Sequence, residues 1–213
     1  MTVNHEDNEI KIEKYVASNY NNNLYIVKCK KTGEVMVIDA PKNITEILQW
    51  AELTQINLLA ITHGHFDHIE GFNDLPTVIQ NATAIHEADS NQLPITAPRH
   101  LREGETLQLG ELSLQIIHTP GHTPGGICIL VRNHLFSGDT LFPGGPGKTR
   151  SSEALTQIID SITRKLLTLP DDTAVYPGHG LDTTIGEARR QYQEFASRPH
   201  PEGLFGDVDW LAV

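Results

Sequence analysis

The sequence predicts an α+β fold in which two β-sheets pack face to face and helices cover their outer faces. Two observations lead to this prediction. The chain has two strand-rich halves, each followed by helical segments, and most of the strands are apolar enough to be buried on both faces. The 213 residues, 38% of them hydrophobic, are enough for a substantial core. No repeat or linker divides the chain, so we expect one domain over residues 1–213.

The first half is predicted to contain strands and one helix. A turn at residues 31–34 separates the second strand from the third. Asn43 and Glu46 have the spacing of a capping box, which predicts a helix start. The segments that alternate or run apolar as strands do are residues 11–18, 24–29, 35–39 and 58–62. The predicted buried face of the helix consists of Ile44, Ile47, Leu48 and Ala51.

The second half repeats this pattern with two hairpins and two helices. One hairpin turns at Gly110 and the other at Arg132 and Asn133. Apolar residues at helical spacing predict a helix over residues 152–167. Thr184 and Glu187 form a second capping box, opening a helix to about Phe195 after a short strand at 174–176. The tail, residues 198–213, carries four apolar residues that look exposed, and the sequence assigns it no structure.

Charge and cysteine usage exclude several classes of protein. The net charge of −11 disfavours binding to nucleic acid, which needs basic patches. No apolar run is long enough to span a bilayer, and the N-terminus lacks the basic and apolar parts of a signal peptide. Cys29 and Cys128 are isolated in apolar segments, as buried strand residues are. We therefore expect a cytoplasmic monomer or homodimer with no membrane or nucleic-acid partner.

A dense run of metal-ligand side chains follows the strand at residues 58–62. His63, His65, Asp67 and His68 lie within six residues, and Gly64 permits a tight turn between them. Loops at strand ends present functional groups on a rigid scaffold. A chance excess of histidine in a polar loop is the alternative, but four ligand-type residues packed this closely favour metal binding.

Three further ligand candidates also come directly after strands. His122 follows Gly121, Asp139 follows Gly138, and His179 lies between Gly178 and Gly180. Imidazole and carboxylate ligands suit zinc, iron or manganese, and the absence of cysteine ligands argues against a structural zinc site. The remaining histidines lie outside these motifs and are interpreted as solvated or structural residues. His118, four residues before His122, could also support the site. These remaining histidines are His5, His86, His100, His118, His134 and His200.

The order His-x-His-x-Asp-His, Gly-His, Gly-Asp, Gly-His resembles the metallo-β-lactamase superfamily, over nearly the whole chain. The resemblance implies a four-layer αββα sandwich with two metal ions at one edge of the sheets. Zinc is the expected metal, with iron or manganese as alternatives. It implies that Asp139 bridges the two metals. One metal would be held by His63, His65 and His122, and the other by Asp67, His68 and His179.

Such a metal pair predicts hydrolysis of an acyl bond in a small-molecule substrate. Two metals can share a water and lower its pKa to about 7, giving a bridging hydroxide without a protein base. Asp67 would orient this nucleophile, and the metals would stabilise the oxyanion. A thiol, with a pKa of about 8.5, leaves without a proton donor, whereas an amide nitrogen needs one. The motifs supply no obvious donor, so thioester hydrolysis is the reaction predicted.

The stretch from Gly138 to Lys148 resembles the glyoxalase II branch, the hydroxyacylglutathione hydrolases. That resemblance implies that Lys148 binds the glycine carboxylate of glutathione, and a solvated loop lysine is the alternative. Larger members carry a C-terminal helical domain that this length does not accommodate, so we expect a small single-domain member. The bridging aspartate argues against a true β-lactamase. We expect the loop 143–151 and the tail after Arg198 to shape the pocket.

A second reading is a persulfide dioxygenase, which resembles this family but holds one iron. His63, His122 and Asp139 could supply its ligands. Those enzymes typically carry Gly-Arg-Thr-Asp-Phe where this chain has Gly-Lys-Thr-Arg-Ser at residues 147–151, which favours hydrolysis. A lactonase or phosphoesterase on the same site is also open.

Overall fold

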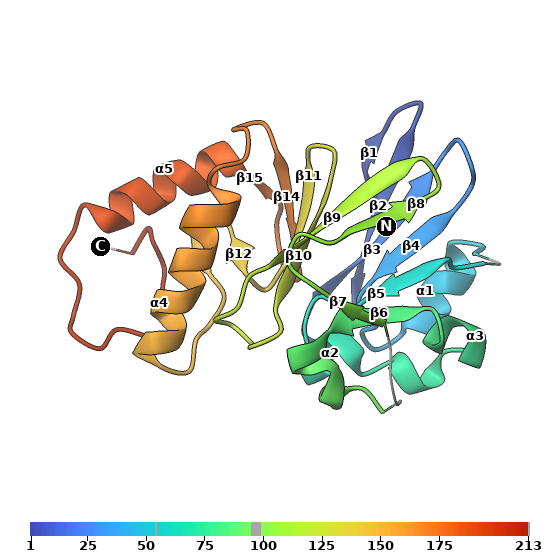
Figure 1. Ribbon diagram of the computed structural model, residues 1–213, viewed down its shortest axis with the longest axis horizontal. Coiled ribbons are helices and arrows are strands. Elements are labelled where there is room, and N and C mark those ends of the chain that lie inside the picture. The colour runs from blue at the N-terminus through green and yellow to red at the C-terminus, as the bar shows by residue number, and fades with distance from the viewer. Residues whose placement is uncertain (54, 95–98, 213) are drawn as a thin grey trace.

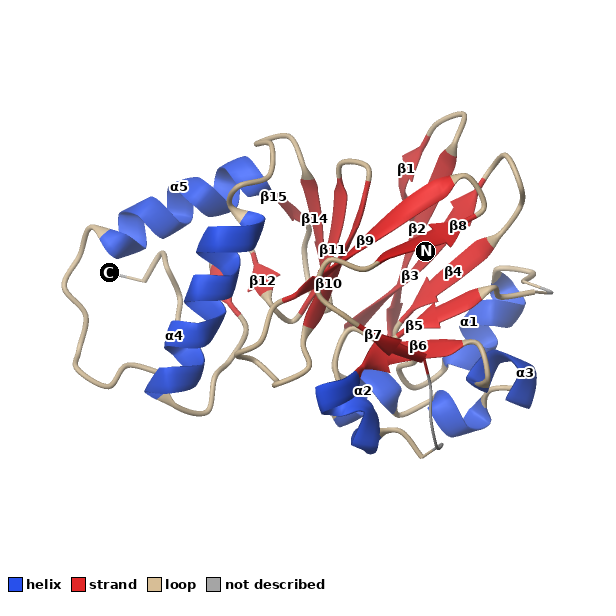
Figure 2. Ribbon diagram, viewed as in Figure 1, coloured by secondary structure: helices blue, strands red, loops and turns tan. Residues whose placement is uncertain are grey.

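Two mixed β-sheets pack face to face, and helices lie on both sides of them, as predicted (Figures 1 and 2). This computed structural model describes residues 1–53, 55–94 and 99–212. The apolar residues between the sheets include Tyr25, Met36 and Phe136, which are at most 2% exposed. The fold class predicted from the sequence is therefore confirmed.

The first sheet has seven strands in chain order within the described residues. The first four strands pair antiparallel and the last four pair parallel, with β4 belonging to both sets. The carboxyl ends of β4 and β5 therefore lie at the same edge. The strands are β1 (Thr2–Glu6), β2 (Ile10–Ala17), β3 (Asn22–Cys29), β4 (Val35–Ile38), β5 (Leu58–Ala60), β6 (Thr83–His86) and β7 (Arg99–Leu101).

The second sheet has the order β15-β14-β11-β10-β9-β8. Because β10 is antiparallel to both β9 and β11, and β11 is parallel to β14, the strands β9, β11 and β14 end at one edge. A small ribbon of β12 (Leu141–Phe142) and β13 (Gly145–Pro146) lies beside it. The sheet strands are β8 (Thr106–Leu109), β9 (Leu112–His118), β10 (Ile127–Val131), β11 (His134–Gly138), β14 (Ala174–Pro177) and β15 (Thr183–Thr184).

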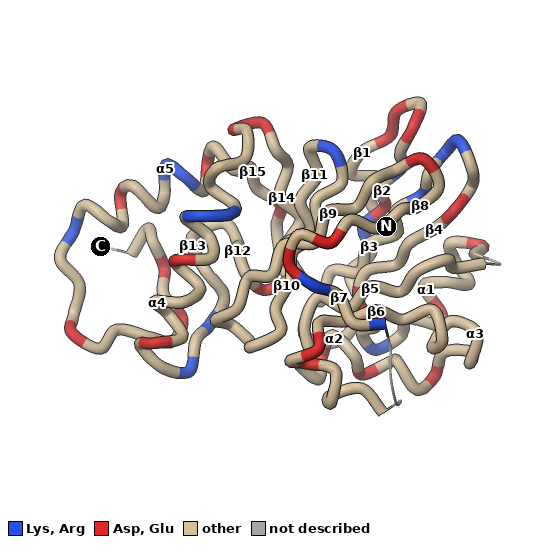
Figure 3. The backbone as a smooth tube through the Cα atoms, viewed as in Figure 1, with Lys and Arg blue, Asp and Glu red and all other residues tan. Residues whose placement is uncertain are grey.

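The helices divide between the two outer faces (Figure 2). The first three lie beside the first sheet, while α4 and α5 cover the second with an apolar cluster beneath them. Acidic residues are spread over both halves of the molecule (Figure 3). The helices are α1 (Ile44–Trp50), α2 (Phe66–Ile69), α3 (Thr77–Gln80), α4 (Ser152–Ser161) and α5 (Ile185–Ala196), with 3₁₀ turns at Phe72–Asp74 and Glu87–Gln92.

The first predicted capping box is wrong, although the helix it was meant to open exists. Asn43 has a left-handed backbone, with φ of 67°, and its side chain caps no N–H of the helix. Glu46 instead accepts a hydrogen bond from the hydroxyl of Thr45. At α5, by contrast, the Thr184 hydroxyl accepts from the Glu187 N–H at 3.2 Å, so this N-cap is confirmed.

Two other segments differ from the prediction. The helix predicted over residues 152–167 is α-helical only to Ser161 and continues as a π-helical turn over Ile162–Leu166. In the tail, Trp210 is fully buried beside Tyr192, with ring centroids 5.3 Å apart, and Val208 is 8% exposed. The expectation of exposed apolar residues there is wrong for these two, because they close the apolar cluster beneath α4 and α5.

Both cysteines are free and buried, as expected for strand residues. Among the residues that the structure describes, no helix combines the length and apolar character needed to cross a membrane.

A buried histidine far from the candidate ligands makes folding sensitive to acid. His134 is 4% exposed and its Nδ1 lies 3.1 Å from the Tyr176 hydroxyl. Burial, with His5 and Arg132 nearby, lowers the pKa of His134 to about 4. The unfolded chain, with a histidine pKa near 6.5, then binds more protons than the folded chain between about pH 6.5 and 4.

We predict that acidification through this window lowers the free energy of unfolding by up to about 1.4 kcal/mol per pH unit through His134 alone. His134→Gln removes the proton-binding group and should reduce the slope of unfolding free energy against pH in this window. Urea unfolding at several pH values measures the slope. Identical slopes for wild type and variant would contradict the assignment.

Candidate metal centre

All seven predicted ligand residues follow strands whose carboxyl ends lie at one edge of the sandwich. The run from His63 to His68 follows β5, and His122 follows β9. Asp139 follows β11, and His179 follows β14. The register of the sheets thus brings together side chains that are more than a hundred residues apart in sequence.

The seven residues form three overlapping sets of ligand atoms, which share His63 and His68. Ligand atoms in each of three sets lie within 4.8 Å of one another. The carboxylate of Asp139 lies between the sets: its Oδ2 is 3.4 Å from His122 Nε2 and 3.6 Å from His179 Nε2, and its Oδ1 is 3.5 Å from His68 Nε2. The sets are His63, His65 and His122; His63, His68 and Asp139; and Asp67, His68 and His179.

Asp39, which the sequence analysis treated only as a strand end, orients two of the histidines. Its buried carboxylate accepts hydrogen bonds from His68 Nδ1 at 2.8 Å and from the Thr62 hydroxyl at 2.9 Å. The Thr62 oxygen in turn lies 3.1 Å from His63 Nδ1, which donates to it. Both rings therefore carry their proton on Nδ1 and turn Nε2 toward the cluster.

Backbone carbonyls orient two further rings. His122 Nδ1 donates to the carbonyl of Lys148 at 2.8 Å, and His179 Nδ1 donates to that of Tyr20 at 3.0 Å. His65 differs, because its Nδ1 faces His63 Nε2 at 3.1 Å. No residue-type signal in the sequence could have identified these carbonyls.

When the rings are neutral, several of the ligand atoms cannot pair with one another by hydrogen bonds, and divalent cations fit between them. His68 Nε2 faces His179 Nε2 at 3.1 Å, although both rings use their single neutral-state proton elsewhere. His122 Nε2 and Asp139 Oδ1 are buried with no hydrogen-bond partner. Each such orphan costs about 1–3 kcal/mol. Cations between these atoms would remove the conflict, and imidazole with carboxylate suits zinc, iron or manganese.

The electrostatics keep Asp139 ionised and His63 neutral. Burial lowers the pKa of His63 well below its ordinary value. Burial opposes ionisation of Asp139, but the charge and the hydrogen bond of His68 outweigh it and hold the pKa of Asp139 far below its usual range. For His68, burial is outweighed by the carboxylates of Asp39 and Asp139, which raise its pKa. The cluster is thus built to attract positive charge.

Asp89 is a second residue that sequence reasoning missed. It is 4% exposed, and its two carboxylate oxygens accept the N–H of Gly64 at 2.9 Å and that of Gly125 at 2.8 Å. It therefore ties the loop of His63 and His65 to the loop of His122. A Cβ at Gly125 would lie 2.6 Å from the carboxylate of Asp89, which explains the glycine there.

The other predicted candidates lie outside the cluster. The ring of His118 stacks on that of His86, with centroids 3.9 Å apart, and its Nε2 donates to the Pro124 carbonyl. The side chain of Lys148 is 66% exposed, and its Nζ lies 3.2 Å from a carboxylate oxygen of Asp207.

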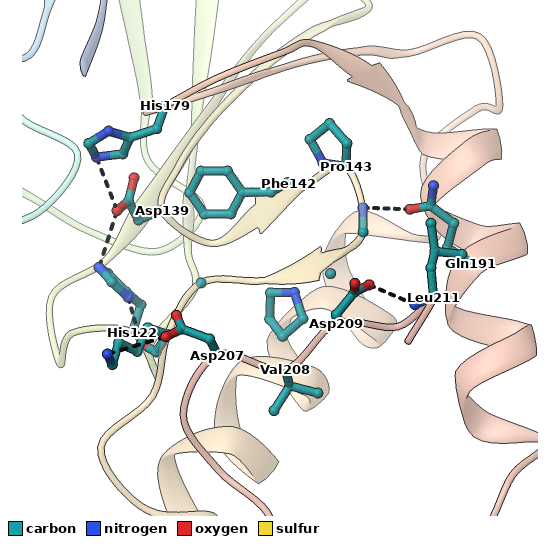
Figure 4. Close-up of a pocket in the computed structure, with 15 residues that line it drawn as sticks. His122, Asp139, Phe142, Pro143, His179, Gln191, Asp207, Val208, Asp209 and Leu211 are labelled. Carbon is teal, nitrogen blue, oxygen red and sulfur yellow. Dashed lines mark hydrogen bonds and ion pairs between the residues drawn. The ribbon is translucent and has the colours of Figure 1, made fainter. Parts of the chain in front are cut away.

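A cavity of 610 Å³ opens beside the cluster (Figure 4). His122, Asp139 and His179 form one end of it, and Phe142 lies next to them. The other walls come from residues 143–148, from Gln191 of α5 and from the tail at residues 207–209 and 211. The expectation that this loop and the tail shape the pocket is confirmed.

Known proteins share this fold. The model of the metallo-β-lactamase superfamily matches residues 19–179. The chain belongs to the metallo-β-lactamase superfamily. Members of this superfamily are metal-dependent enzymes, so the His/Asp cluster is the metal-binding site expected of one.

Three relatives illustrate the range within this superfamily. A probable polyketide biosynthesis zinc-dependent hydrolase, BaeB of Bacillus velezensis, is 29% identical over 94% of this chain and 97% of its own. A hydroxyacylglutathione hydrolase of a Polaromonas species is 34% identical over 75% of this chain and 62% of its own. The crystal structure of ETHE1 from Myxococcus xanthus superposes with a TM-score of 0.77 at 30% identity, covering 88% of this chain and 85% of that one.

The role of Asp39 is testable through metal affinity. Asp39→Asn removes the charge that holds His68 and Thr62, and places an amide where a carboxylate accepts three donors, the N–H and hydroxyl of Thr62 and the Nδ1–H of His68. We predict a loss of roughly 10- to 100-fold in zinc affinity. Competition with a chromogenic chelator measures this, with circular dichroism to verify the fold.

Asp74→Asn is the matched control, because Asp74 is exposed on the surface. Equal zinc affinities for the Asp39 variant, the Asp74 variant and the wild type would contradict the orienting role of Asp39.

Proposed function

We propose that this protein is a dinuclear metallohydrolase that cleaves acyl thioesters of small molecules. The observation that carries the proposal is the position of Asp139 between two complete sets of ligand atoms. We assign His63, His65 and His122 to one metal, Asp67, His68 and His179 to the other, and Asp139 to both.

When bound, such a metal pair supplies a water of lowered pKa and polarises the acyl carbonyl. The chain's own residues hold and aim these groups. Asp67 accepts hydrogen bonds from Asn22 Nδ2 at 2.8 Å and lies 3.2 Å from His179 Nε2. One of its oxygens is thereby fixed, and the carboxylate can orient the attacking water toward the cavity beside Phe142.

The thioester assignment is supported by chemistry and by the relatives. A thiolate leaves without protonation, whereas an amine does not. In the cavity, the ammonium of Lys148 is paired with Asp207 rather than directed at a leaving group. The similar proteins include a hydroxyacylglutathione hydrolase and a zinc-dependent hydrolase.

A second candidate is persulfide oxidation at a single iron. It is favoured by the likeness to ETHE1, a persulfide dioxygenase. His63, His122 and Asp139 would be the ligands, and the Nε2 atoms of both histidines lie within 4.0 Å of Asp139 Oδ2. This arrangement leaves His65, Asp67, His68 and His179 without a role, so hydrolysis is the better supported function.

Metal analysis and turnover on one sample separate the two candidates. We predict two metals per chain, hydrolysis of S-lactoylglutathione or another acyl thioester, and loss of that activity on chelation. His68→Ala should reduce kcat/KM at least about 100-fold, because it removes a group shared by two ligand sets.

One iron per chain with oxygen consumption on a persulfide would refute hydrolysis. Turnover of lactones or phosphoesters alone would refute the thioester assignment while leaving the metal pair intact.

A further inference from the structure

The C-terminal tail is a fixed wall of the cavity. The N–H of Trp210 donates to the Gly144 carbonyl at 2.6 Å, and the N–H of Thr149 donates to the Gly206 carbonyl at 3.1 Å. Gly206 returns a hydrogen bond from its N–H to the Thr149 hydroxyl at 3.2 Å. Because Trp210 is fully buried, the tail holds Asp207 and Asp209 at the mouth of the cavity.

The charged groups that this wall contributes are mostly acidic. Apart from the candidate metal ligands, the charged residues lining the cavity are Lys148, Asp207 and Asp209, one positive and two negative. The Nζ of Lys148 lies 3.2 Å from a carboxylate oxygen of Asp207, within ion-pair distance. Arg150 lies near His65, where its charge contributes to lowering the pKa of that ring, and is not among the lining residues. Outside the proposed metal centre, the lining therefore offers no uncompensated cation to the thiol part of an anionic substrate.

Apart from the amide of Gln191, the side chains of the rest of the wall are apolar. Phe142, Pro143, Pro146, Val208 and Leu211 line it. At Gly145 a Cβ would come within 2.7 Å of the Val208 carbonyl, so the loop and the tail pack without a gap. Such walls accommodate an uncharged chain, whereas burying an unpaired carboxylate against them is costly.

We propose that Asp207 and Asp209 make this site select thioesters whose thiol part carries no net negative charge. The inference rests on the proposed thioester hydrolysis and narrows its substrate class. The thiol of glutathione carries two carboxylates and one ammonium, and in this cavity it would meet Asp207 and Asp209 with Lys148 already paired. Neutral thiols meet no such repulsion.

The test compares one acyl group on three thiols: glutathione, neutral N-acetylcysteamine and cationic thiocholine. With zinc-loaded enzyme at low ionic strength, we expect kcat/KM to be lowest for the glutathione ester. Asp207→Asn frees Lys148 and should raise the ratio of kcat/KM for the glutathione ester to that for the N-acetylcysteamine ester by roughly three- to tenfold. Lys148→Gln should lower the same ratio.

Glu202→Gln is the matched control, because it removes one negative charge from the same tail at an exposed position outside the lining. Its ratio should stay within about twofold of wild type. Added salt should shrink the effect of Asp207→Asn, because screening weakens charge interactions at the surface.

A binding measurement keeps the two proposals separate. Calorimetry with the unreactive thioethers S-methylglutathione and S-methyl-N-acetylcysteamine reports charge preference without turnover. If no thioester is hydrolysed, the proposed function fails while calorimetry still decides the charge preference. The charge preference would be refuted, with the proposed function intact, by two results together. The enzyme would bind S-methylglutathione and hydrolyse the glutathione ester in preference to the neutral compounds, and Asp207→Asn would leave the ratio of the kcat/KM values unchanged.

Discussion

The close approach of His68 Nε2 and His179 Nε2, whose rings both use Nδ1 in other hydrogen bonds, is the constraint on which this structure depends. The two Nε2 atoms lie 3.1 Å apart. A neutral imidazole has one N–H, and the bonds of His68 to Asp39 and of His179 to the Tyr20 carbonyl use it, so this pair requires added positive charge. The raised pKa of His68, where burial is outweighed by the carboxylates of Asp39 and Asp139, expresses the same requirement. Cations resolve the conflict, and much of the surrounding structure serves to keep these lone pairs aimed at them.

The fold meets this constraint by joining loops from both sheets. Asp39 links the end of β4 to Thr62 and His68, and Asp89 links the loop of His63 and His65 to that of His122. The Lys148 carbonyl then connects His122 to the loop that lines the cavity. Metal binding and pocket shape are thus coupled through the backbone, since the loop that orients a ligand also carries the substrate wall.

The sequence predicted the longer strands and the seven clustered residues because both leave local patterns, and it missed several short strands, among them the buried β6. Apolar runs ending in glycine-flanked histidine or aspartate mark strands and the loops after them. It missed Asp39 and Asp89, since a single carboxylate has no spacing signal and its partners lie elsewhere in the chain. The edge strands β1 and β7 are short and partly polar, and Trp210 is buried only because α4 and α5 meet the tail. The failed cap at Asn43 reflects a left-handed backbone, which tertiary packing sets and local sequence does not.

The Lys148 interpretation illustrates the limit of motif transfer. The lysine stands where the glyoxalase II resemblance implies, yet Asp207, some sixty residues later, lies within ion-pair distance of it. A motif predicts a residue's position, whereas the charge that the residue presents depends on neighbours that fold against it. We therefore expect substrate selection at this centre to depend on the tail as well as on the histidine motifs.

The proposed function requires two cations at this edge of the sandwich. Anomalous diffraction at the zinc edge, from crystals grown with zinc, would locate them. We expect two peaks, one among His63, His65 and His122 and one among Asp67, His68 and His179, with Asp139 between them. A single peak at full occupancy with excess zinc, or none, would contradict this expectation.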